Sequence, residues 1–88
     1  MLKPTSSNDW RATVSRLIKS EMSKTNTKYE ELSQRLAAHG TQQSAANLRN
    51  KINRGILGAD LFIQLLIAIN VNQLNRDTIL EILSNINE

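Results

Sequence analysis

The sequence predicts an all-α domain built from five short helices. Apolar residues recur at three- and four-residue spacings in five separate segments, and no segment alternates apolar and polar residues as a strand would. Capping residues and glycines stand between these segments, so each helix is short. We expect a flexible lead-in at residues 1–8 and a single domain at 9–88, with helices at about 9–24, 28–38, 43–54, 59–70 and 76–87.

The first helix begins after a Thr-Ser-Ser-Asn run that follows Pro4. Asp9, or Asn8 before it, can cap the free amides of its first turn. One apolar stripe follows the helical period and predicts the face turned to the core, with Trp10 as a core residue; its members are Trp10, Val14, Leu17, Ile18 and Met22.

The second helix is predicted from Thr27 and Glu30, which have the spacing of a capping box. Gly40 is a natural stop at its other end. The residues that we expect on its apolar face are Tyr29, Leu32 and Leu36.

The third helix follows the capping groups of residues 41–44 and ends at Gly55. Its inward side is predicted to consist of Ala45, Leu48 and Ile52.

The fourth helix contains the unusually apolar segment LFIQLLIAI. Ile63 and Ile67 form a second stripe beside its main apolar stripe of Phe62, Leu65, Leu66 and Ile69. The fifth helix is capped by Asp77 or Asn75, and its broad apolar face is formed by Ile79, Leu80, Ile82, Leu83 and Ile86.

The net charge of +3 is unevenly distributed along the chain. Residues 1–58 hold ten Lys and Arg against four acidic residues, whereas residues 59–88 hold one Arg against four acidic residues. A basic first part is suited to a polyanionic partner. A solvated surface with uneven charge is the plainer alternative.

Polar side chains gather on the outward face of the third helix. A stripe at helical spacing lies opposite Leu48 and Ile52, with Arg49 and Lys51 beside it, and consists of Gln43, Asn47, Asn50 and Arg54. Asn and Gln can bond adenine twice, and Arg can bond guanine twice, so this stripe has the chemistry of base reading. No acidic residue lies between Glu31 and Asp60, which avoids repulsion of phosphates. The alternative is that the stripe is only the solvent-facing side of the helix, because any amphipathic helix has a polar stripe opposite its apolar one.

The segment YEELSQRL, a turn, a helix ending in INRG and an apolar LLIAINV segment resemble the lambda-repressor-like (XRE-type) helix-turn-helix domains over residues 10–75. The resemblance implies a compact five-helix lambda-repressor-like helix-turn-helix fold, with the third helix in the major groove. The segment NLRNKINRG also resembles a small bacterial family of unknown function.

The TQQS at residues 41–44 resembles the start of a recognition helix in a lambdoid phage repressor. That likeness adds Gln42, Gln43 and Ser44 to the base-reading residues. Alignment on TQQS makes the third helix about one turn too long, whereas alignment on INRG lengthens the turn, so two registers remain open. The phosphate contacts expected in this geometry are Lys28, Arg35, Arg49 and Lys51.

The apolar residues of the last two helices exceed what a small core needs, which predicts a homodimer interface. The residues expected there are Ile63, Ile67, Ile79, Ile82, Leu83 and Ile86. Packing on the first helix is the alternative, and another protein, such as a toxin, is a third possible occupant.

Sequence features typical of enzymes, metal sites and cofactor sites are missing. Cys is absent, His39 is the single histidine and we expect it to be a capping or solvent-facing residue, and no Gly-rich phosphate loop occurs. We therefore expect no enzymatic activity, metal or cofactor. The first residues lack the apolar core of a signal peptide, and no segment is long enough to span a membrane, so we expect a cytoplasmic protein without membrane contact.

These observations favour a sequence-specific DNA-binding protein that acts as a small transcriptional regulator. The alternative is a protein-interaction module, antitoxin-like or an accessory subunit, that works through the apolar fourth and fifth helices.

Overall fold

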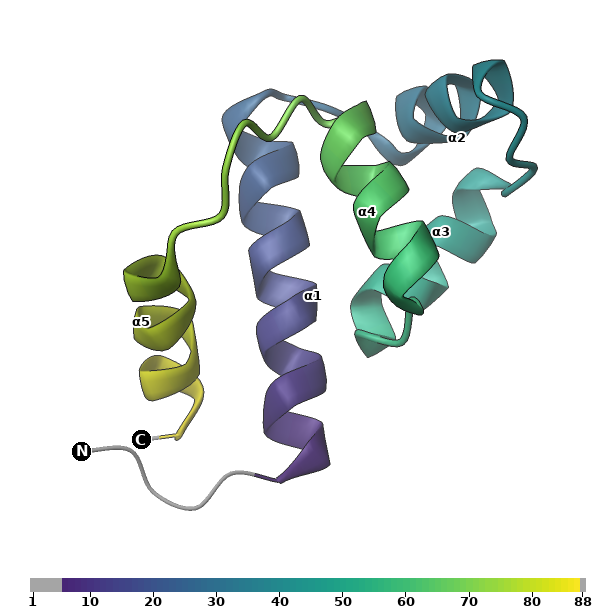
Figure 1. The fold of residues 1–88 in the computed structure, drawn as a ribbon. Coiled ribbons are helices and arrows are strands. Elements are labelled where there is room, and N and C mark those ends of the chain that lie inside the picture. Colours follow the sequence, from purple (N-terminus) through teal and green to yellow (C-terminus); the bar gives the residue numbers. More distant parts are fainter. Residues whose placement is uncertain (1–5, 88) are drawn as a thin grey trace.

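The computed structural model describes residues 6–87, which fold into five α-helices (Figure 1). No strand occurs in this range, so the predicted all-α class is confirmed. Every helix end lies within two residues of its expected position. The helices are α1 Ser7–Lys24, α2 Tyr29–Ala38, α3 Ala45–Arg54, α4 Ala59–Ala68 and α5 Arg76–Asn87.

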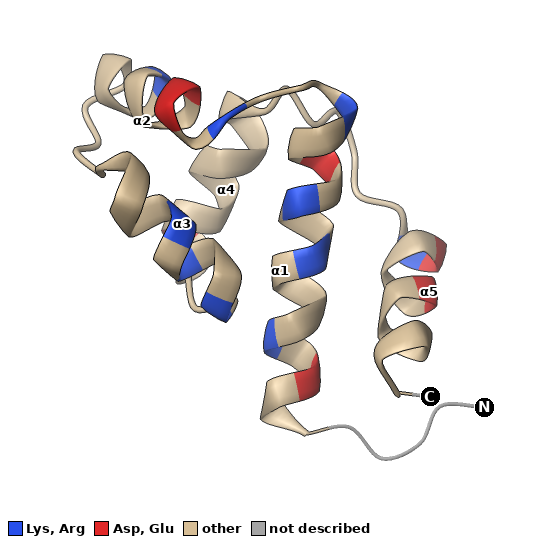
Figure 2. Cartoon of the chain, turned by 180° about the vertical axis from the view of Figure 1, so that it is seen from behind, with Lys and Arg blue, Asp and Glu red and all other residues tan. Residues whose placement is uncertain are grey.

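Helix α1 lies between α5 on one side and the remaining helices on the other (Figures 1 and 2). Helix α3 packs on both α1 and α2, α4 packs on α2, and α5 packs on α1. This arrangement is elongated, with extents of 42 × 22 × 20 Å. The radius of gyration of 13.2 Å exceeds the roughly 12 Å expected for a compact chain of this length.

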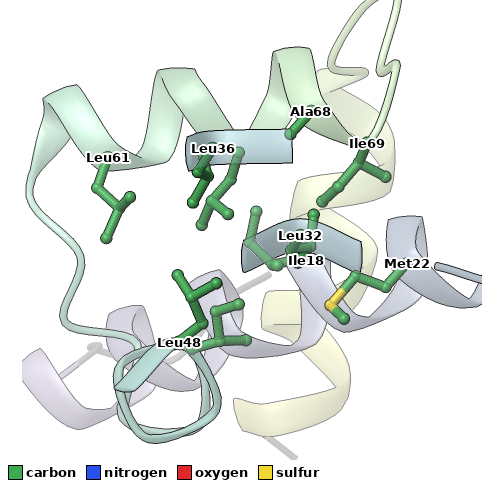
Figure 3. Close-up of a cluster of buried hydrophobic side chains, with 10 residues drawn as sticks. Ile18, Met22, Leu32, Leu36, Leu48, Leu61, Ala68 and Ile69 are labelled. Carbon is green, nitrogen blue, oxygen red and sulfur yellow. The ribbon is translucent and has the colours of Figure 1, made fainter. Parts of the chain in front are cut away.

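The main core lies where α1, α2, α3 and α4 meet (Figure 3). Leu32, Leu48, Ile52 and Leu65 are fully buried in it, as the spacing of apolar residues predicts. Tyr29, Phe62 and Leu66 pack against this cluster while keeping part of their surface in solvent. The core therefore fixes α3 through two side chains on a single face, Leu48 and Ile52. The opposite face of α3 takes no part in the core.

Three helix starts differ by one or two residues from those expected, and α3 begins at Ala45 in place of 43. Ser6, rather than Asn8 or Asp9, caps α1, and its hydroxyl accepts from the amide of Asp9 while the Asp9 carboxylate accepts from the amide of Ser6. Residues 7 and 8 therefore belong to the helix and not to a lead-in, while residues 1–5 lie outside the described range.

Helix α2 begins one residue later than the expected capping box implies. Lys28 is its N-cap residue, and the Glu31 carboxylate accepts from the Lys28 amide at 3.3 Å. Thr27 is buried instead, and its hydroxyl lies 2.6 Å from that of Thr25. The second N-cap choice for α5 is confirmed, since the Asn75 side chain accepts from the amides of Asp77 and Thr78.

Trp10 is not a core residue, because half of its surface is exposed (51%). It stands near the N-terminal end of α1, one turn before Val14, beyond the reach of the main core. In α4, Leu61 and Ala68 are buried. Phe62 and Leu66, which were expected to be buried, are only partly buried. An almost wholly apolar helix offers no polar face to mark its inward side, which explains the error.

Candidate nucleic-acid interface

Helix α3 is held in place by the connection that precedes it. The amide of Thr41 donates to the carbonyl of Leu36 at 2.9 Å, and its hydroxyl donates to the Gln64 side chain of α4 at 2.6 Å. The Ser33 hydroxyl donates to the carbonyl of Gln43 at 2.6 Å. The six residues between α2 and α3 are therefore hydrogen-bonded to both α2 and α4. These bonds hold α3 in position even though the connection is six residues long.

The outward face of α3 carries the polar stripe predicted from the sequence. Asn47, Asn50 and Arg54 are exposed on the side opposite Leu48 and Ile52. Their side chains make no hydrogen bond with other described residues, so their donors and acceptors face solvent. The adjoining Ala46 and Asn53 are exposed as well.

The residues of the TQQS segment lie before α3 and not within it. Ser44 is the N-cap, and its hydroxyl accepts from the amide of Asn47 at 3.0 Å. Gln43 is partly buried, and its side-chain oxygen accepts from the Lys51 ammonium at 3.4 Å. Gln42 is exposed. Of the three residues of this segment that were assigned to base reading, Gln42 has a side chain that is fully available.

Cations surround the open face of α3. Lysine and arginine positions lie along both α3 and α1 in the view of Figure 2. The guanidinium of Arg49 stands over the Tyr29 ring, with its central carbon 5.3 Å from the ring centroid. Lys28, at the start of α2, is exposed. These contacts place one cation of α3 beside the first turn of α2.

An open hollow of about 250 Å³ lies between the C-terminal end of α1 and the start of α2. Lys19 and Lys28 line it from the two helices, and Tyr29 forms part of its wall. Lys19 was not assigned from the sequence, because nothing in the helical period of α1 shows which exposed lysine faces the start of α2. Its position five residues before Lys24, the last residue of the helix, gives no separate signal.

Arg35, which the sequence predicts to contact phosphate, makes two contacts within the protein. Its guanidinium donates to the carbonyl of Ala68 at 2.7 Å and contacts the Glu31 carboxylate at 3.4 Å. The Ala68 carbonyl lies at the C-terminal end of α4, where the helix leaves carbonyls without internal partners. Arg35 therefore joins α2 to α4 and is paired with Glu31, while 39% of its side-chain surface stays exposed. Its role as a phosphate contact stays a prediction.

The predicted dimer residues do not form one free surface. Ile63 and Ile67 are exposed on α4, at 56% and 63%. Leu83 is buried at 1%, and α5 packs on α1, as the alternative prediction held. The remaining expected residues of α5 are partly buried, namely Ile79, Ile82 and Ile86.

The described residues include no group of three or more His, Asp or Glu side chains arranged to hold a metal ion. His39 is the C-cap residue of α2; it is exposed, and its ring nitrogen lies 2.9 Å from the carbonyl of Arg35. None of the helices within residues 6–87 is long and apolar enough to cross a lipid bilayer.

Comparison with known proteins yields one family. Residues 10–74 match the family described as Domain of unknown function (DUF6471), a span that runs from the first turn of α1 through α4 to the connection before α5. No curated protein and no solved structure matches. The expected likeness to a small family of unknown function is thereby confirmed. Because the match covers more than half of the chain, this protein belongs to the DUF6471 family.

Proposed function

We propose that this protein binds double-stranded DNA in a sequence-specific manner and acts as a small transcriptional regulator. In this proposal the domain is of the lambda-repressor-like helix-turn-helix kind, and α3 enters the major groove. The observation that carries the proposal is the open face of α3, where amide and guanidinium groups face solvent without intramolecular partners and without a neighbouring acid.

The side chains on this face suit the edges of base pairs. The amides of Asn47 and Asn50 each offer a donor and an acceptor, the pair of groups that adenine presents in the major groove. Arg54 can donate twice to guanine. Ala46, on the same open face, is small and permits close approach of the helix to the groove. Gln42 extends the reading surface beyond the first turn of α3.

The cations around α3 suit the phosphates on either side of the groove. Lys28 and Lys19 line a hollow beside the first turn of α2. Arg49 and Lys51 flank the reading stripe on the two sides of α3. Contacts of this kind fix the position of a protein on a duplex, while the base contacts supply the sequence preference.

The test is selection from a randomised duplex library with purified protein at near-physiological salt. We expect enrichment of a defined sequence. Arg54→Ala should weaken binding to the selected site by about 1–3 kcal/mol and relax the preference at one position. Arg76→Ala, which removes an exposed cation of α5, is the matched control and should leave both unchanged. Absence of enrichment, with weak and uniformly salt-dependent binding, would refute specific recognition.

A second candidate function is a protein-interaction module, antitoxin-like or an accessory subunit. The exposed Ile63 and Ile67 of α4 favour it, together with an open hollow of about 140 Å³ that is lined by Leu36, His39, Gln64 and Ile67. This candidate predicts that Ile67→Glu abolishes binding of the partner protein. Substitutions in the polar stripe of α3 should leave that binding unchanged. The library selection separates the two, because a module of this type enriches no DNA sequence.

A further inference from the structure

An apolar surface lies at the end of the molecule where α1 begins and α3 passes into α4. We call it the Trp10 patch, and define it as Trp10, Val14, Ile56, Leu57 and Phe62. Trp10 and Ile56 are about half exposed, at 51% and 52%. Val14, Leu57 and Phe62 line an open hollow of about 290 Å³, completed by the backbone of the α3–α4 connection. Trp10 precedes Val14 by one turn of α1, and Ile56 precedes Leu57.

The Trp10 patch is preformed by close packing of its three segments. Gly55 has a positive φ of 67° and lies so near the Arg11 backbone of α1 that a Cβ atom there would clash with it. The amide of Ile56 donates to the carbonyl of Lys51 at 3.1 Å, which fixes the chain as it leaves α3. A partner therefore meets a surface that requires little ordering on binding, which favours affinity.

Both signs of charge border this patch. Arg11 and Arg54 stand on one part of its border and Asp60 on another, adjoining Val14, Gly55 and Phe62 along the chain. None of these three side chains forms an ion pair within residues 6–87. A polyanion would be repelled by Asp60, and an uncharged peptide would leave all three charges without partners. These three charges are complemented by a partner surface that itself carries cations and an anion around an apolar centre.

We propose that the Trp10 patch is the contact surface for a second copy of this chain, related by a two-fold axis. A two-fold axis brings the same surface from both copies together, so the apolar centres meet. It also sets the Asp60 border of one copy toward the Arg11 border of the other, twice. The surface differs from that expected from the sequence, because it uses α1 and the α3–α4 connection in place of α5.

The proposed contact has a consequence for α3. Ile56 follows Arg54 by two residues, so a two-fold pair through the Trp10 patch holds the C-terminal ends of both α3 helices close to the axis. The self-association itself does not depend on the proposed function, and its test contains no nucleic acid.

The test uses the intrinsic fluorescence of the full chain, because Trp10 is its single tryptophan. A dilution series is recorded from hundreds of micromolar to nanomolar protein, with sedimentation equilibrium in parallel. We expect a dimer at the upper end, and a shift of the emission to longer wavelength as it dissociates. Ile56→Glu should raise the dissociation constant at least a hundredfold. Ile67→Glu makes the same change on an exposed isoleucine outside the patch, and should leave the constant within threefold of the original.

Several results would overturn the proposal. One is a monomer at every concentration. Another is a dimer that Ile67→Glu disrupts and Ile56→Glu does not. A third is an emission maximum at short wavelength that is insensitive to dilution, which would mean that another occupant, such as residues 1–5 of the same chain, covers Trp10. Circular dichroism of both variants shows whether the helices are retained, so that loss of the dimer is distinguished from unfolding.

Discussion

At the scale of the residue, Gly55 is subject to two independent constraints. Its φ of 67° disfavours any side chain, and the space that a Cβ would need is occupied by the backbone of Arg11. We expect Gly55→Ala to lower the free energy of unfolding by clearly more than the 1–2 kcal/mol or so of the left-handed conformation alone. Urea unfolding followed by circular dichroism measures this change.

Gly40→Ala provides the matched control. Gly40 also has a positive φ, of 88°, at the end of α2, but a Cβ there would meet nothing within 4 Å. The cost should therefore be limited to the conformational term, about 1–2 kcal/mol. Equal costs at the two glycines would mean that the contact between Gly55 and α1 contributes nothing.

Arg35 provides a second prediction at this scale. Its guanidinium donates to the Ala68 carbonyl and so joins two helices that pack on each other. Arg35→Ala should lower the free energy of unfolding by about 1–2 kcal/mol, because it removes a hydrogen bond from a charged group to the end of α4. Lys28→Ala, at an exposed position, should change it by less than about 0.5 kcal/mol. An Arg35 variant as stable as the parent chain would show that the bond to the Ala68 carbonyl contributes nothing to stability.

The contrast between Arg35 and Arg54 shows how far the sequence predicts the site. Arg54 was assigned from helical periodicity, and Arg35 from the docking geometry that the family resemblance implies; both lie on the helices expected. Arg54 faces solvent as expected, since Leu48 and Ile52 define the inward side of α3. Arg35 is engaged because α4 ends beside α2, a contact between segments 33 positions apart along the chain. Such long-range contacts leave no trace in the spacing of residues on one helix.

At the scale of the element, the helices were predicted well because each has capping groups, a glycine or an asparagine at its ends. The inward faces were predicted less evenly. Helix α3 is strongly amphipathic, and its buried residues were predicted correctly. Helix α4 is apolar on most sides, and the buried Leu61 and Ala68 were missed. In α1 the small polar residues Thr13 and Ser15 are also buried, because helices pack on two of its sides.

Helix α5 should be the least stable element. It packs on α1 and has one fully buried apolar side chain, Leu83. We expect its amides to exchange hydrogen with a lower opening free energy than those of α3, which packs on two helices. Leu83→Ala should accelerate exchange in α5 selectively, since truncation of a buried leucine costs about 2–5 kcal/mol. Equal acceleration throughout α2 and α3 would show instead that the domain opens as a single unit.

At the scale of the whole molecule, charge is unevenly distributed among the helices. The basic residues concentrate in the part that includes α1, α2 and α3, whereas the last thirty residues carry a single cation, Arg76. Since α1 separates α5 from α2 and α3, the acidic α5 lies away from the open face of α3 (Figures 1 and 2). In the proposed function, a polyanion approaching α3 meets cations first, so this charge distribution favours an orientation with α3 toward the duplex.

This distribution predicts the salt dependence of DNA binding. Four cations near the open face, Lys19, Lys28, Arg49 and Lys51, are the expected phosphate contacts. The logarithm of the association constant should fall with the logarithm of the salt concentration with a slope of about −3 to −4 per copy. Fluorescence anisotropy of a labelled duplex at several salt concentrations measures this slope.

Single charge removals test which cations produce the slope. Lys28→Ala should reduce its magnitude by about one for each bound copy, and should do so equally on the selected sequence and on an unrelated one, because a phosphate contact carries no base preference. Arg76→Ala removes the same charge from the far side of α1 and should leave the slope unchanged. If both variants reduced the slope alike, the net charge of the chain and not the surface around α3 would determine binding, and the assignment of α3 to the groove would lose its electrostatic support.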